Sequence, residues 1–86
     1  MAETMMQWAK ERVDDQPTFD TKEEAVQRAL EELRRGEICE VWQKPDGKYI
    51  ACNWVAFEAA FRYGCKQIIN AAKLSDELQT EEIEEV

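Results

Sequence analysis

The chain has 86 residues, of which 44% are hydrophobic and 35% charged, with a formal net charge of −8 and no histidine. This composition is typical of one small folded domain, and no apolar run approaches the roughly 20 residues of a membrane-spanning helix. The absence of histidine excludes nucleophilic catalysis by a Ser–His or Cys–His pair.

The negative charge is concentrated at one end of the chain. Residues 1–75 hold 13 acidic and 11 basic side chains, a balance of −2, whereas residues 76–86 hold six acidic and no basic side chains, a balance of −6. We therefore divide the chain into a compact domain, 1–75, and an acidic tail, 76–86. The domain lacks the basic footprint of a nucleic-acid-binding protein, so direct binding to DNA or RNA is not expected.

The first predicted element is a short amphipathic helix from Met5 to Val13. Helical spacing places four apolar side chains on one side, namely Met5, Trp8, Ala9 and Val13. The helix is expected to end before Pro17, because proline disfavours helical backbone at the residue preceding it.

The second predicted helix has the clearest signals. Thr21 and Glu24 have the spacing of a capping box, with Asp20 as an alternative cap, and Gly36 is a suitable left-handed stop. The apolar stripe of this helix consists of Ala25, Val26, Ala29, Leu30 and Leu33.

A β-hairpin is predicted from two strands, 38–43 and 49–54, around the turn sequence Lys-Pro-Asp-Gly-Lys. Pairing of Lys44 with Lys48 places Trp42 opposite Ile50. Both faces of the hairpin are then largely apolar, which an isolated two-stranded ribbon cannot satisfy.

A third helix is predicted from Val55 to Lys73, with Gly64 on its apolar side, where another backbone would approach closely. Ser75 is expected to cap a last short helix or to begin a tail. The predicted fold is therefore α+β, with the order α-α-β-β-α and one antiparallel hairpin packed by two or three helices.

The sequence predicts no conventional catalytic or metal-binding site. The three cysteines, Cys39, Cys52 and Cys65, form no C-x-x-C pair and are expected to be buried, reduced thiols of a cytoplasmic protein. A zinc site that combines them with a carboxylate is a minor alternative. The neighbouring carboxylate pairs suit solvated helix faces. We therefore expect no enzyme activity, no cofactor and no metal.

Aromatic residues near the hairpin are the first candidates for contact with a partner. Trp54, Phe57 and Phe61 are expected in the core, whereas Trp42 and Tyr49 lie near the turn on opposite faces of the hairpin. If the helices cover only one face, the other is free to bind a partner protein or to be sealed by a homodimer.

The acidic tail is the second candidate. Its glutamates could form a steering arm that docks on a basic surface of another protein, or the tail could be a disordered, solubilising end. The four residues assigned to the arm are Glu81, Glu82, Glu84 and Glu85.

The order helix, Gly36, strand, Pro45-Asp46-Gly47 turn, strand resembles a common small bacterial and phage α-β-β module, with generic motifs. In size, acidity and lack of catalytic residues, the chain also resembles, in type, small phage-encoded inhibitors of host systems such as anti-CRISPR proteins. This likeness implies a non-catalytic inhibitor or regulator of a host nucleic-acid-handling or defence complex. The alternative is a small homodimeric structural or assembly protein. Neither likeness assigns a site residue.

Overall fold

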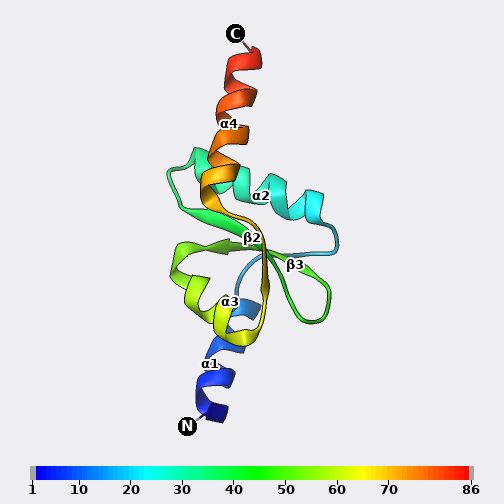
Figure 1. Ribbon diagram of the computed structural model, residues 1–86, viewed down its shortest axis with the longest axis vertical. Helices are drawn as coiled ribbons and strands as arrows, with labels where there is room; N and C mark the ends of the chain where they lie inside the picture. The colour runs from blue at the N-terminus through cyan, green and yellow to red at the C-terminus, as the bar shows by residue number, and fades with distance from the viewer. Residues whose placement is uncertain (1, 86) are drawn as a thin grey trace.

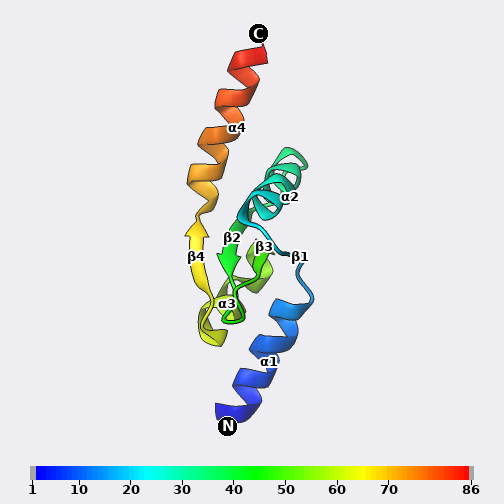
Figure 2. The same cartoon turned by 90° about the vertical axis from the view of Figure 1, so that its right-hand side faces the viewer.

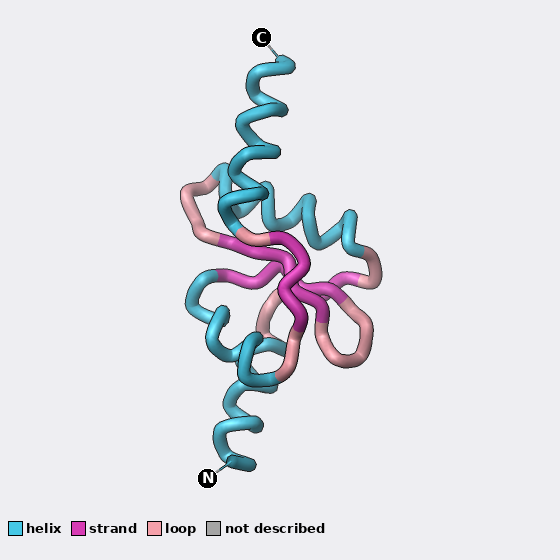
Figure 3. Tube along the Cα trace, viewed as in Figure 1, coloured by secondary structure: helices cyan, strands magenta, loops and turns pink. Residues whose placement is uncertain are grey.

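The computed structural model describes the backbone of residues 2–85 and the side chains of residues 4–78. This part of the chain forms one compact α+β domain (Figures 1 and 3). No helix in it is long and apolar enough to cross a membrane. The elements are α1 (Ala2–Asp14), β1 (Thr18–Phe19), α2 (Lys22–Arg34), β2 (Cys39–Gln43), β3 (Tyr49–Asn53), the 3₁₀ helix η1 (Trp54–Ala56), α3 (Phe57–Tyr63), β4 (Lys66–Ile69) and α4 (Ala71–Glu85).

The predicted hairpin forms the centre of a four-stranded antiparallel sheet with the order β1-β3-β2-β4. Its register is the predicted one, since Trp42 pairs with Ile50. The amide of Lys44 donates to the carbonyl of Lys48 at 2.7 Å, and Gly47 takes a φ of 93°. β1 pairs with β3 and β4 pairs with β2. These two strands correct the predicted order α-α-β-β-α.

The predicted third helix, 55–73, consists of several separate elements. Gly64 ends α3 with a φ of 93°, and the amide of Cys65 donates to the carbonyl of Ala60 at 2.9 Å. This is the Schellman pattern, in which glycine takes the left-handed conformation that other residues disfavour. A Cβ at position 64 would meet nothing within 4 Å, so the predicted close approach of another backbone is not found. The chain then turns into β4.

Helices cover both faces of the sheet. One core cluster lies under α1 and α3 and includes Trp42, Ile50 and Cys52. The other lies under α2 and α4 and includes Val41 and Ala51. Figures 1 and 2 show α2 and α4 toward one end of the molecule, and α1 and α3 toward the other. The expectation that one hairpin face stays uncovered is therefore wrong, because α1 and α3 pack on one face while α2, together with α4, packs on the other.

Glu40 in β2 is a buried carboxylate that connects three elements. Its Oε1 accepts hydrogen bonds from Nε1 of Trp42 at 3.0 Å and from Nε2 of Gln67 in β4 at 2.9 Å. Its Oε2 accepts from the backbone amide of Ala71, the first residue of α4, at 3.1 Å. A carboxylate at this position also interacts favourably with the positive end of the helix dipole. Glu40 therefore joins β2 to β4 and holds the beginning of α4.

We predict that Glu40→Gln lowers the free energy of unfolding by about 1–3 kcal/mol, as for a buried hydrogen-bonding group left without a partner. The side-chain amide of glutamine has one acceptor oxygen. Either the Ala71 amide or the Trp42 and Gln67 donors must then face an NH₂ group. Urea unfolding measures the change. The control Glu58→Gln removes an exposed pair with Arg62 and should change stability by less than about 1 kcal/mol. Equal effects of the two substitutions would contradict the role of Glu40.

Candidate protein-binding surfaces

Trp42 and Tyr49 lie on opposite faces of the sheet, as their positions in the hairpin require. Trp42 is only 7% exposed, within the core cluster under α1 and α3. Tyr49 is half-buried and packs against the other cluster, under α2 and α4. The structure does not bring the two side chains together. The reason for choosing them as partner contacts, an uncovered hairpin face, does not hold.

The acidic segment 76–86 belongs to α4 through residue 85, so the boundary drawn at residue 75 falls inside a helix. α4 begins at Ala71 rather than near Ser75, and Oδ1 of Asn70 accepts a hydrogen bond from the amide of Lys73 at 2.8 Å. The backbone of the four predicted arm residues is helical, whereas their side chains lie outside the described part of the chain: Glu81, Glu82, Glu84 and Glu85. Their role as a steering arm stays a prediction.

Several large apolar side chains on or beside η1 and α3 are exposed. Phe61 is 75% exposed and Trp54 is 56% exposed, although both were expected in the core. Ile38 and Val55 are also more than half exposed. The amide of Trp54 donates to the carbonyl of Ile38 at 2.9 Å, which places these two residues side by side at the open end of the hairpin. We refer to these four residues as the aromatic surface.

The packing of α3 against α1 explains why Phe61 is exposed. Three fully buried alanines form the side of η1 and α3 that faces the core, and Ala9 of α1 lies in the same cluster. Small side chains allow the two helices to approach closely. One 3₁₀ turn from Trp54 leads to the half-buried Phe57, and about one α-helical turn more leads to Phe61. These three aromatic residues therefore follow one line along the helix. In the sequence, the spacing of Ala56, Ala59 and Ala60 is the feature that could have indicated which side of η1 and α3 faces the core.

Local hydrogen bonds hold the aromatic surface in place. Oδ1 of Asn53 accepts from the amide of Val55 at 3.2 Å and so caps η1. Nδ2 of Asn53 donates to Glu37 at 3.4 Å, which ties η1 to the segment before β2. At the other end, Gly64 terminates α3. The exposed side chains therefore project from a fixed backbone, which reduces the conformational entropy that binding would lose.

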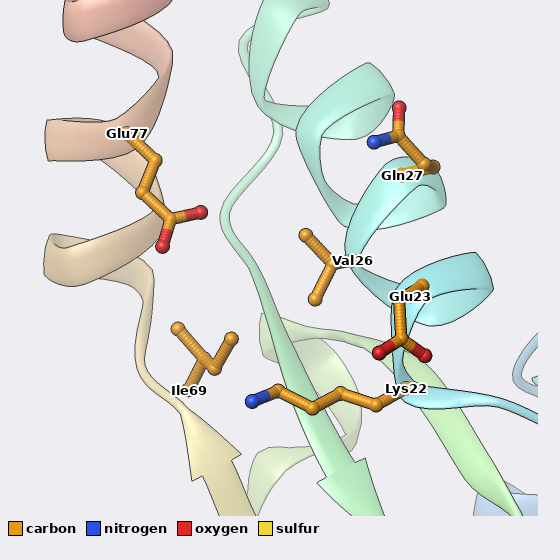
Figure 4. Close-up of a pocket in the computed structure, with 6 residues that line it drawn as sticks. All are labelled: Lys22, Glu23, Val26, Gln27, Ile69 and Glu77. Carbon is orange, nitrogen blue, oxygen red and sulfur yellow. The ribbon is translucent and has the colours of Figure 1, made fainter.

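A shallow groove of about 270 Å³ lies between α2 and α4 (Figure 4). Val26 and Ile69 contribute its apolar lining, and Figure 4 shows the side chains of Lys22 and Glu77 directed into the space between the two helices. The lining residues include neither a hydroxyl nor a thiol nucleophile: Lys22, Glu23, Val26, Gln27, Ile69 and Glu77. Within the described residues, no group of three or more His, Cys, Asp or Glu side chains is arranged to hold a metal ion.

The three cysteines are buried free thiols. Cys39 belongs to the cluster under α2 and α4, whereas Cys52 and Cys65 belong to the cluster under α1 and α3. Cys39 pairs with Asn53 across the hairpin, as predicted. Desolvation raises the pKa of Cys39 to about 11 and that of Cys52 to about 12, and it also raises the pKa of Cys65. Burial therefore keeps all three thiols protonated and poorly nucleophilic.

Comparison of the chain with protein-family models, with curated proteins and with solved structures finds no match.

We predict that none of the three native thiols reacts quickly with an aromatic disulfide reagent at a pH of about 8, near the pKa of an ordinary thiol. Because each pKa is raised, the thiolate fraction stays small until the pH rises well above that value. All three should react in denaturant. Glu58→Cys, which adds a thiol at an exposed position of α3, should react at once and serves as the positive control. Fast reaction of Cys39 or Cys52 in the folded protein would show that the sheet opens readily.

Proposed function

We propose that the protein is a non-catalytic inhibitor or regulator that acts by binding another protein through the aromatic surface. The observation that carries this proposal is the exposure of Phe61 and Trp54, 75% and 56%, on the well-fixed helices α3 and η1. Small soluble domains rarely leave large clustered apolar side chains in water unless a partner covers them. Tryptophan is also among the residues that contribute most to binding energy at protein interfaces.

The composition of the aromatic surface supports a protein partner rather than a nucleic acid. Its four members carry no charge, and the charged residues of α3, Glu58 and Arg62, pair with each other at 3.0 Å. A nucleic-acid site would instead present unpaired lysines or arginines to phosphate groups. An uncharged aromatic centre with a paired charge beside it has the usual character of a protein interface, with a hydrophobic core and a polar rim.

In this proposal, the negative charge of the acidic segment 76–86 attracts a partner electrostatically over a long range. Its balance of −6 lies at the opposite end of the molecule from α1, as Figure 1 shows. A basic surface, such as the one with which a protein binds nucleic acid, has the complementary charge. We propose that the segment accelerates the encounter with such a partner, while the aromatic surface provides most of the affinity.

A capture experiment tests the contact surface. Wild-type protein should retain a partner from a lysate of the source cells, and a variant carrying Trp54→Ser and Phe61→Ser should retain at least about tenfold less, the equivalent of about 1.4 kcal/mol. Both side chains are exposed, so the variant should unfold at nearly the same urea concentration. A variant with Met5→Ser and Trp8→Ser, substituted on α1, is the matched control and should retain the partner. Equal capture by all three proteins, or capture of nothing by the wild type, would refute the proposal.

The acidic segment can be tested without shortening α4. Replacing Glu81, Glu82, Glu84 and Glu85 with glutamine removes four negative charges and keeps good helix-forming residues. With the captured partner, we expect a slower association rate, a weaker dependence of that rate on salt, and a dissociation rate close to that of the wild type. Surface plasmon resonance over a range of ionic strengths measures all three. An unchanged association rate at low salt would leave the segment without a steering role.

A further inference from the structure

The first turns of α1 carry an apolar side that the rest of the chain leaves uncovered. Ala9 and Val13 are fully buried against α3, and Met6 continues the same stripe one turn earlier, yet it is 47% exposed. Beside it, Met5 is 49% exposed and Trp8 is 37% exposed. Figures 1 and 2 both show the beginning of α1 extending past α3 and the sheet. We refer to Met5, Met6 and Trp8 as the apolar end of α1.

The rest of the domain cannot fold over this end of α1. Ala9 and Val13 fix the second half of the helix, and Asp14 pairs with Lys10 at 3.1 Å and with Lys44 at 3.5 Å. The amide of Ala51 in β3 donates to the carbonyl of Pro17 at 3.1 Å, which anchors the segment that follows α1 to the sheet. Because α1 is held at its C-terminal half, the described residues of this chain leave the stripe open to contact with another molecule.

The charge distribution suits a second copy of the same chain as that molecule. Residues 2–14 carry two basic and three acidic side chains, a balance of −1, so two such helices repel each other little. The acidic segment 76–86, with a balance of −6, lies at the opposite end of a molecule whose long axis measures 53 Å. That length is several times the Debye length of about 8 Å at physiological salt. Contact at the α1 end therefore keeps the two acidic segments apart, whereas contact at the α4 end would bring them together.

We infer that the protein forms a symmetric dimer in which the apolar end of α1 packs antiparallel against the same segment of a second copy. An antiparallel pair of identical helices has twofold symmetry, so the stripe of one copy meets the stripe of the other. The apolar stripe of α1, whose C-terminal half packs against α3, thus continues into the dimer contact. Three large side chains from each copy make a smaller contact than a standard interface, so the dimer dissociates on dilution.

Sedimentation equilibrium tests this inference. From low micromolar to near-millimolar concentration, the apparent mass of the wild type should rise from 10.1 kDa toward about twice that value. The variant with Met5→Ser and Trp8→Ser should stay monomeric over the same range. Because these side chains are already largely exposed, its urea midpoint at low protein concentration should match that of the wild type.

The variant with Trp54→Ser and Phe61→Ser is the matched control and should dimerise like the wild type. This arrangement separates dimer formation from partner binding, because each pair of substitutions should abolish one and leave the other. Raising the salt concentration should not dissociate the dimer, since the contact is apolar. A wild type that stays monomeric throughout overturns the inference. The opposite pattern also overturns it: if the Trp54 and Phe61 variant stays monomeric while the Met5 and Trp8 variant still dimerises, the contact lies on the aromatic surface.

Discussion

The hydrogen bonds of one buried carboxylate, that of Glu40, connect β2 to β4 and to the beginning of α4. Glu40 accepts from Gln67 in β4 and from the amide of Ala71, so it holds the edge strand and orients the helix that follows. α4 in turn supplies Leu74, which is fully buried in the cluster under α2. Because Glu40 also accepts from Trp42 in the opposite cluster, it couples the packing on the two faces of the sheet.

With one face covered by α2 and α4, the other face determines what the molecule presents to solvent. There, α1 and α3 approach each other through alanines, including Ala9 and Ala59, rather than through large side chains. Close approach through small residues leaves no room in the core for Trp54 and Phe61, whereas Phe57 and Tyr63 pack at its edge. Trp54 and Phe61 therefore remain outside for the same reason that α3 packs so tightly, and their exposure is a consequence of the fold.

The elements governed by local chemistry could be predicted from the sequence. Thr21 caps α2 with its hydroxyl accepting from the amide of Glu24 at 3.3 Å, and the turn at Gly47 sets the hairpin register. The apolar stripe of α2, with Ala25, Ala29 and Leu30 buried, also lies where its helical spacing indicated. In each case residues close in sequence determine the backbone.

The elements and surfaces that depend on contacts between distant parts of the chain could not be predicted from the sequence. β1 has only two residues, too few to show alternation, and exists through its pairing with β3. β4 was absorbed into a long helix because its apolar residues also fit helical spacing, and Gly64 alone marked the break. The exposed surfaces could not be predicted because the sequence contains more apolar side chains than two helix–sheet interfaces bury. Which of them stay outside depends on the orientation of α3, which alanines determine.

The two proposed contacts differ in position, and this has a physical consequence. The apolar end of α1 lies on the turns of that helix that extend past α3, whereas the aromatic surface lies on η1 and α3. Self-association through α1 therefore leaves Trp54 and Phe61 open in both copies. Such a dimer presents two aromatic surfaces and two acidic segments at once. A partner with a single site contacts one aromatic surface at a time, so each surface keeps the affinity that it has in the monomer, and the Met5 and Trp8 variant retains such a partner. Avidity arises only against a partner with repeated or paired sites, where the second contact forms at a high effective concentration. A weak dimer then strengthens partner binding without any additional contact, because the partner itself holds the two copies together.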